Sequence, residues 1–100
     1  MLVNTFSLKY DPDWGVHLSD TRSQLVIADN KILYAESPVK STAFKSREDA
    51  IERYNGNRKI QQIDIYKIKI YLIGDISIEL VTKESYEIDE IFNLIKKRID

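Results

Sequence analysis

The fold is decided by residues 66–80, YKIKIYLIGDISIEL. Apolar residues alternate on both sides of Gly74-Asp75, which predicts an antiparallel hairpin. A two-residue loop would set Lys69 across from Leu80 and mismatch the two faces. A three-residue loop at 73–75, with Gly74 near the left-handed region, makes every face agree. It pairs Leu72 with Ile76, Ile70 with Ile78, Ile68 with Leu80 and Lys69 with Glu79.

Just before this hairpin, the apolar alternation changes phase. Ile63 and Ile65 share one parity, whereas Tyr66 and Ile68 share the other. A paired strand usually needs an extra residue to change phase, so we expect a β-bulge or a break between two strands near 65–66.

Two helices are predicted. The longer, at 86–99, has Ser85 as its N-cap, acidic residues in its first turn and basic residues in its last. Its apolar residues follow helical spacing and should cover one face of the sheet: Ile88, Ile91, Phe92, Ile95 and Ile99. The shorter, at about 47–55, begins after Ser46 with Asp49 three residues on, and stops at Asn55-Gly56.

The N-terminal third predicts strands. Residues 4–10 alternate, and Asp11-Pro12-Asp13 supplies a turn before a second alternating run at 14–18. Runs at 24–28 and 31–36 around Asp29-Asn30 suggest another hairpin. The predicted class is a single α+β domain, residues 1–100. It has a mostly antiparallel sheet of five or six strands and two helices, in the order β-β-β-β-α-β-β-α.

The composition excludes several classes of protein. The 100 residues include no cysteine, which excludes disulfides, thiolate zinc sites and cysteine catalysis. The N-terminus lacks the basic and apolar regions of a signal peptide, and no apolar run is long enough to span a bilayer. We therefore expect a cytoplasmic protein with no membrane association. Glycine-rich nucleotide cradles are missing as well, and no cofactor is predicted.

The net charge of -1 is unevenly distributed. Residues 40–69 carry a net +4, and tyrosines are interleaved among the basic residues. One hypothesis is therefore a small nucleic-acid-binding protein that uses this surface, although acidic residues dilute it and no reader motif is present. The candidate residues are Arg47, Arg53, Arg58, Lys59 and Lys67.

His17 is the only histidine. With Asp11, Asp13 or Asp20, or with Arg22, it could serve a minimal nuclease, which is the weakest of our hypotheses. The aspartates do not follow the spacing of a calcium loop, and turn formation explains them more simply. The simplest interpretation of His17 is an outward strand residue beside Trp14. No catalytic residue or metal site is predicted.

The favoured hypothesis is a protein-binding module. Tryptophan and tyrosine are enriched at interfaces, and Trp14 follows a turn at a strand end, so Tyr10, Trp14 and His17 are the candidate contacts, although Trp14 fits the core equally well. An edge of the N-terminal sheet could also pair with another chain, including a second copy.

The run FKSREDAI, residues 44–51, resembles helix openings in small accessory proteins of bacteriophages and plasmids. The length, the richness in lysine, isoleucine, asparagine and tyrosine, and the lack of a catalytic signature resemble that class too. The resemblance implies a phage or mobile-element protein that inhibits or modulates a host or defence protein by steric binding.

Overall fold

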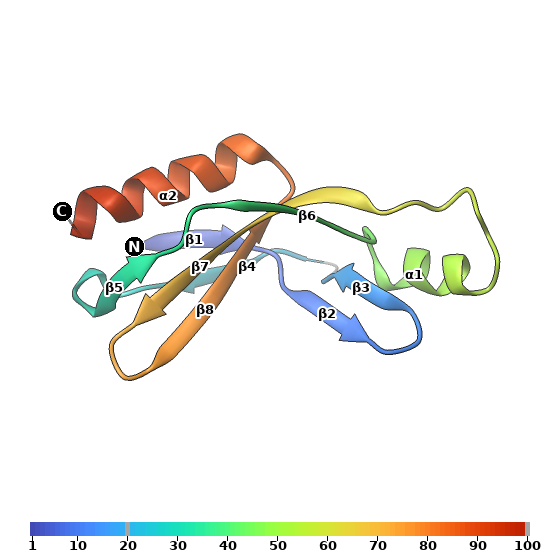
Figure 1. Ribbon diagram of the computed structural model, residues 1–100, viewed down its shortest axis with the longest axis horizontal. Helices are drawn as coiled ribbons and strands as arrows, with labels where there is room; N and C mark the ends of the chain where they lie inside the picture. The colour runs from blue at the N-terminus through green and yellow to red at the C-terminus, as the bar shows by residue number, and fades with distance from the viewer. Residues whose placement is uncertain (20, 100) are drawn as a thin grey trace.

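The computed structural model describes residues 1–19 and 21–99 (Figure 1). It confirms the α+β class, the mostly antiparallel pairing and both helices, α1 (Arg47–Tyr54) and α2 (Ser85–Ile99). The described residues form more strands than the sequence predicts, with six before α1 in place of four. The strands are β1 (Leu2–Thr5), β2 (Leu8–Asp11), β3 (Gly15–Leu18), β4 (Ser23–Val26), β5 (Ile32–Ala35), β6 (Val39–Ala43), β7 (Ile63–Leu72) and β8 (Ile76–Thr82).

The β7–β8 hairpin has the predicted register. Leu72 pairs with Ile76 and Lys69 with Glu79, so the loop is the three residues 73–75. Gly74 has a φ of 96° and Asp75 a φ of 57°. Both lie in the left-handed region, which glycine enters freely and aspartate tolerates. Side-chain alternation and loop chemistry therefore determine this hairpin locally.

The predicted bulge near 65–66 is wrong. β7 is one continuous strand of ten residues. On one edge it pairs with β8, and on the other it pairs with β6 and then with β5. The pairings through Ile65 and Tyr66 show no register shift, and the irregularity lies instead in β5, between Ile32 and Tyr34.

The change of phase arises because the two halves of β7 bury opposite faces. Ile65 belongs to one core cluster, whereas Ile68 and Ile70 belong to another. Odd and even residues of a strand point to opposite faces, so different parts of the protein pack on the two halves of β7. The cluster around Ile65 consists of Phe6, Leu18, Ala43, Ile65 and Val81.

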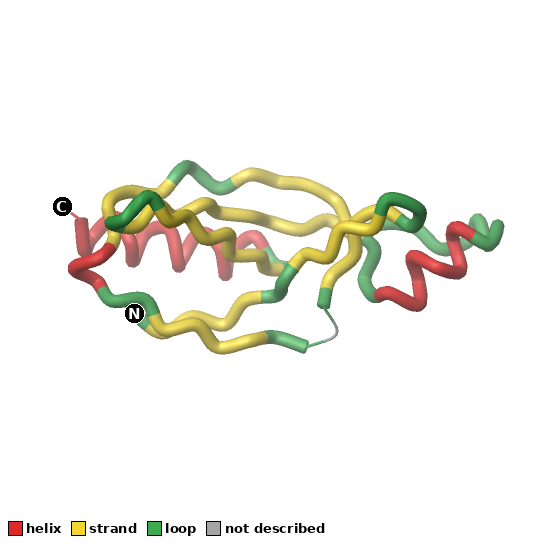
Figure 2. Tube along the Cα trace, turned by 90° about the horizontal axis from the view of Figure 1, so that it is seen from below, coloured by secondary structure: helices red, strands yellow, loops and turns green. Residues whose placement is uncertain are grey.

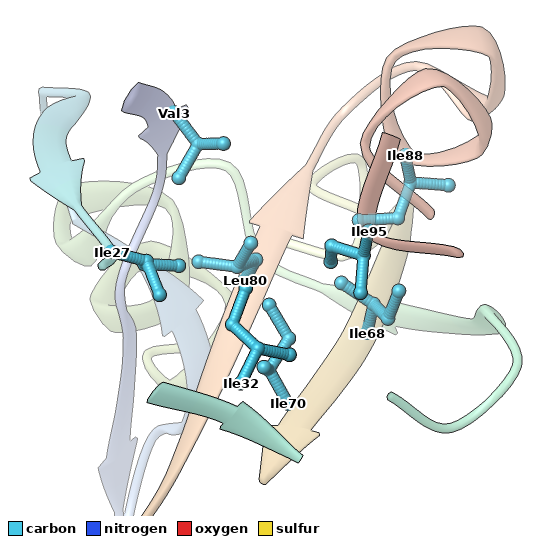
Figure 3. Close-up of a cluster of buried hydrophobic side chains, with 8 residues drawn as sticks. All are labelled: Val3, Ile27, Ile32, Ile68, Ile70, Leu80, Ile88 and Ile95. Carbon is cyan, nitrogen blue, oxygen red and sulfur yellow. The ribbon is translucent and has the colours of Figure 1, made fainter. Parts of the chain in front are cut away.

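The larger cluster lies between α2, the β7–β8 hairpin and the β1–β4 ribbon (Figure 3). α2 packs against β5, β7 and β8, as its apolar spacing predicts. Ile88 and Ile95 are fully buried in this cluster, and Ile91 and Phe92 pack against it. The side chain of Ile99, the fifth member of the predicted set, lies outside the described part of the chain.

The N-terminal strands differ from the prediction in their partners. β2 and β3 form the expected hairpin around the Asp11–Asp13 turn. The predicted strand at 4–10 is two strands, because the chain breaks at Phe6, whose N–H donates to the Val81 carbonyl at 3.0 Å. The hairpin predicted at 24–36 is wrong: a 3-10 turn at Asp29–Lys31 separates β4, which pairs with β1, from β5, which pairs with β7.

The molecule is elongated, 49 × 27 × 20 Å. The β1–β4 ribbon and α2 lie at one end, and the β2–β3 hairpin and α1 at the other (Figure 1). Figure 2 shows the β1–β4 ribbon as a layer separate from the larger sheet. The β2–β3 hairpin joins that sheet through a parallel bridge, in which the Leu18 N–H donates to the Phe44 carbonyl at 2.9 Å.

Candidate binding site

A hollow of about 600 Å3 lies between the β2–β3 hairpin and the start of α1. It brings together all three residues that the sequence selects for partner binding: Tyr10, Trp14 and His17. The remaining lining residues add polar groups, two basic side chains and the apolar Leu18: Lys9, Asp11, Leu18, Ser19, Thr21 and Arg47.

The turn between β2 and β3 places Trp14. One carboxylate oxygen of Asp11 accepts the backbone N–H groups of Asp13 at 2.8 Å and Trp14 at 3.1 Å. Gly15 then has a φ of 86°, a conformation in which a side chain is strained. Carboxylate capping and glycine together fix this turn, and they hold Trp14 half-buried at the end of the hairpin.

Arg47 reaches the hollow because α1 begins where it does. The Ser46 hydroxyl accepts the Asp49 N–H at 3.1 Å, which is the predicted N-cap. Arg47 is therefore the first residue of α1, and its guanidinium carbon lies 5.0 Å from the centre of the Trp14 ring. This distance is within the range of a cation–π contact, which favours this arrangement of the two side chains.

His17 is buried, not outward as the sequence suggests, and only 7% of the residue is exposed. It pairs with Lys9 across the hairpin, and α1 packs against β3. Its Nδ1 atom is buried and has no hydrogen-bond partner among the described residues. Of the two neutral tautomers, the one with its proton on Nε2 leaves only a lone pair at Nδ1, which costs less to bury than an N–H.

Tyr10 lies at the rim of the hollow. It pairs with Val16, so it has the opposite parity to Lys9 and His17, and it is 69% exposed. The charged groups of the lining are the cations Lys9 and Arg47 and the anion of Asp11. Because the Asp11 carboxylate already accepts two N–H groups, the basic side chains remain available to an incoming acidic or polar group.

The basic residues of the nucleic-acid hypothesis do not form one surface. Arg53 and Arg58 line a second hollow of about 600 Å3 with Phe44, Ile60, Gln61 and Gln62. Lys67 lies on β7, where its ammonium is 3.9 Å from the Glu79 carboxylate. Arg47 belongs to the Trp14 hollow. For Lys59 the structure gives only a backbone contact, from its N–H to Asn57 at 3.2 Å.

One aromatic group escapes prediction from sequence. Tyr34 and Tyr71 stack with their ring centres 4.4 Å apart on the open face of the larger sheet. The Tyr71 hydroxyl donates to Glu36 at 2.6 Å, and this hydrogen bond raises the pKa of Tyr71 above its ordinary value of 10.0. The sequence shows that Tyr71 shares a parity with Lys67 and Lys69. It does not show that Tyr71 pairs with β5, which brings Tyr34 beside it.

Among residues 1–19 and 21–99, no three histidine, cysteine, aspartate or glutamate side chains gather closely enough to hold a metal ion. Asp20, one of the candidate acids, lies outside the described residues. In the part of the chain that the structure describes, neither helix is both long and apolar enough to cross a bilayer. The chain matches no protein-family model, no curated protein and no solved structure.

Proposed function

We propose that this protein is a cytoplasmic protein-binding module whose contact surface is the Trp14 hollow. It acts by occupying a surface of a host or defence protein, and it performs no chemistry of its own. The observation that carries the proposal is the meeting of Trp14, His17 and Arg47, from a turn, a strand and a helix, in one hollow.

The residue types support this proposal. Tryptophan, tyrosine and arginine dominate the binding energy of protein interfaces, because they bury large areas while keeping a polar group for a partner. Trp14 is half-buried and Tyr10 largely exposed, so both retain surface to contribute. The Arg47–Trp14 contact favours one arrangement of the two side chains, which reduces the entropy that they lose on binding.

The lining also indicates what kind of surface would fit. Lys9 and Arg47 favour an acidic or polar group, and the Trp14 ring favours an apolar or planar one beside it. A protein segment that presents an acidic side chain next to an apolar one meets both needs. We therefore expect the partner to insert such a segment between the hairpin and α1.

The test is affinity capture from extracts of cells that naturally carry the gene, with the bound proteins quantified by mass spectrometry. Tyr10→Ala and Arg47→Ala change exposed side chains that belong to neither core cluster, and each should lose the partner. Tyr86→Ala is the matched aromatic control, since Tyr86 is 60% exposed on α2. Arg53→Ala, on α1 but at the other hollow, is the matched arginine control.

Equal capture by all four variants would contradict the assignment of the hollow. A wild-type protein that captures no partner in stoichiometric amount would contradict the binding module itself. Circular dichroism of each variant checks that the fold is retained.

Nucleic-acid binding is the second candidate, and the observation in its favour is that Arg53 and Arg58 line one hollow. It predicts affinity for DNA or RNA that falls steeply with added salt and weakens when Arg53, Arg58 and Lys59 become glutamate. Unchanged mobility of single- and double-stranded probes at low salt would remove this candidate.

A further inference from the structure

The β1–β4 ribbon is the part of the fold whose edges are least protected. Among the described strands, β1 and β4 pair only with each other. The inner face of the ribbon buries Val3 and Ile27 in the larger cluster, whereas Leu2 and Val26 on its outer face are 59% and 76% exposed. A two-stranded ribbon is marginally stable alone and gains from a further strand.

The hydrogen-bond pattern shows which backbone groups of β4 face outward. The Ile27 N–H donates to the Met1 carbonyl at 2.7 Å, so Met1 and Ile27 form a hydrogen-bonded pair. Antiparallel pairs alternate, which makes Val3–Leu25 the next hydrogen-bonded pair. The N–H and C=O groups of Gln24 and Val26 therefore point away from β1, toward the free edge.

The sequence of this edge does nothing to prevent pairing. Residues 23–28, SQLVIA, contain no charge and no proline. Two edges of the larger sheet carry such residues: Pro38 precedes β6 and Lys40 lies within it, and β8 contains Glu79. The edge strand β5 has no charge within Ile32–Ala35, but its pairing is irregular between Ile32 and Tyr34. Natural sheets use charged residues and proline to stop such pairing, and their lack along β4 leaves this edge open to a further strand.

We propose that β4 pairs antiparallel with β4 of a second copy of this chain. A two-fold axis at Leu25 sets Gln24 of each copy opposite Val26 of the other. Both residues already point their backbone groups outward, so this register forms four new hydrogen bonds. Leu25, which is half-buried, then meets its symmetry mate at a non-hydrogen-bonded pair, where side chains approach most closely.

A second copy fits this edge because the register satisfies both strands at once and places no like charges opposite each other. The product is one four-stranded sheet, β1–β4–β4–β1. In Figure 1 the ribbon lies at the opposite end of the molecule from the β2–β3 hairpin and α1, which border the Trp14 hollow. Figure 2 shows β4 as the lower strand of the ribbon, along the margin of the molecule. The dimer therefore leaves both hollows free, and this proposal stands independently of the proposed function.

The test is sedimentation velocity over a wide range of protein concentration. The wild-type mass should rise with concentration from 11.7 kDa toward twice that value. Val26→Pro removes an N–H that has no role in the β1–β4 ladder, and it should raise the dissociation constant at least tenfold. Val26→Ala is the control, since it shortens the same side chain but keeps the N–H, and it should still dimerise.

A second pair of variants guards against misfolding of the proline variant. Gln24→Lys with Val26→Lys places four lysines along the shared edge of a dimer and should prevent it at low salt. Asn4→Lys with Leu2→Lys places the same charges on the same face, one strand away, and should leave the dimer intact. A wild-type protein that stays monomeric at its highest soluble concentration overturns the proposal. This holds even if β4 is then found to bind a different protein. A dimer that survives both edge variants overturns it too.

Discussion

Replacing His17 with phenylalanine tests whether the fold is stabilised by a hydrogen bond to a ring nitrogen of His17. His17 is 7% exposed, and its Nδ1 has no hydrogen-bond partner among the described residues. Truncation to alanine opens a cavity and should cost about 2–4 kcal/mol of unfolding free energy. His17→Phe keeps a ring there and removes the unpartnered nitrogen, whose burial costs about 1–3 kcal/mol. The larger ring costs about as much through tighter packing, so the two effects roughly cancel.

The measurement is urea unfolding followed by circular dichroism, with thermal melts as a check. For a domain of this size, 1 kcal/mol corresponds to about 4–8 °C in melting temperature. His17→Ala should therefore melt roughly 8 °C or more below wild type, and His17→Phe should lose less than half as much. Equal losses for the two variants would refute the reasoning, because they would mean that a ring nitrogen has a partner in the native fold.

Three further predictions follow from the geometry. Gly74→Ala places a Cβ at a φ of 96°, where it meets only the Ile76 side chain, at an ordinary contact distance of 3.9 Å. Backbone strain should therefore cost it about 1–2 kcal/mol of unfolding free energy in a urea titration. Asp75→Gly should stay within about 1 kcal/mol of wild type, because relief of strain at a φ of 57° offsets the added chain entropy. The Glu36–Tyr71 hydrogen bond raises the pKa of Tyr71, so the stability that this bond gives is complete below pH 10.0 and is lost as pH rises through the raised pKa. Glu36→Gln should lower the pKa of Tyr71 in a 13C NMR titration of the tyrosines. An unchanged pKa would exclude Glu36 as the cause. Ser46→Ala removes the N-cap of α1 and should cost about 1 kcal/mol by the same urea assay, while a loss below a few tenths would show that the cap is replaced by water.

Local sequence signals predict the local parts of the fold. The β7–β8 register follows from alternation and from Gly74, and α2 follows from helical spacing with charges suited to its ends. The β2–β3 hairpin follows from the Asp11–Asp13 turn. In each case the residues that decide the structure are neighbours in the chain, so their pattern carries enough information.

Pairing between distant segments is beyond such signals. The sequence predicts a strand at 24–28, and the structure has β4 at Ser23–Val26, but the pattern does not show which edge of it finds a partner. Asp29 suggested a hairpin, whereas β4 pairs with β1 and β5 with β7. The sequence shows the phase change at Ile65 but not its cause, because the residues that bury one face of β7 at Ile65 and the other at Ile68 include ones far away in the chain.

The candidate site shows the same division. Tyr10, Trp14 and His17 converge because one local hairpin holds them. Arg47 belongs with them only because α1 packs on β3, whereas its place in the sequence groups it with the other basic residues. The burial of His17 likewise depends on contacts that a single strand pattern does not contain.

The central claim, that the Trp14 hollow is the contact surface, has a direct test because Trp14 is the only tryptophan. Protein labelled with 5-fluorotryptophan gives one 19F resonance, which reports on the hollow alone. Addition of the captured partner should shift or broaden that resonance, and Arg47→Ala should abolish the effect at the same concentrations. A partner that binds at full stoichiometry and leaves the Trp14 resonance unmoved would contradict the account.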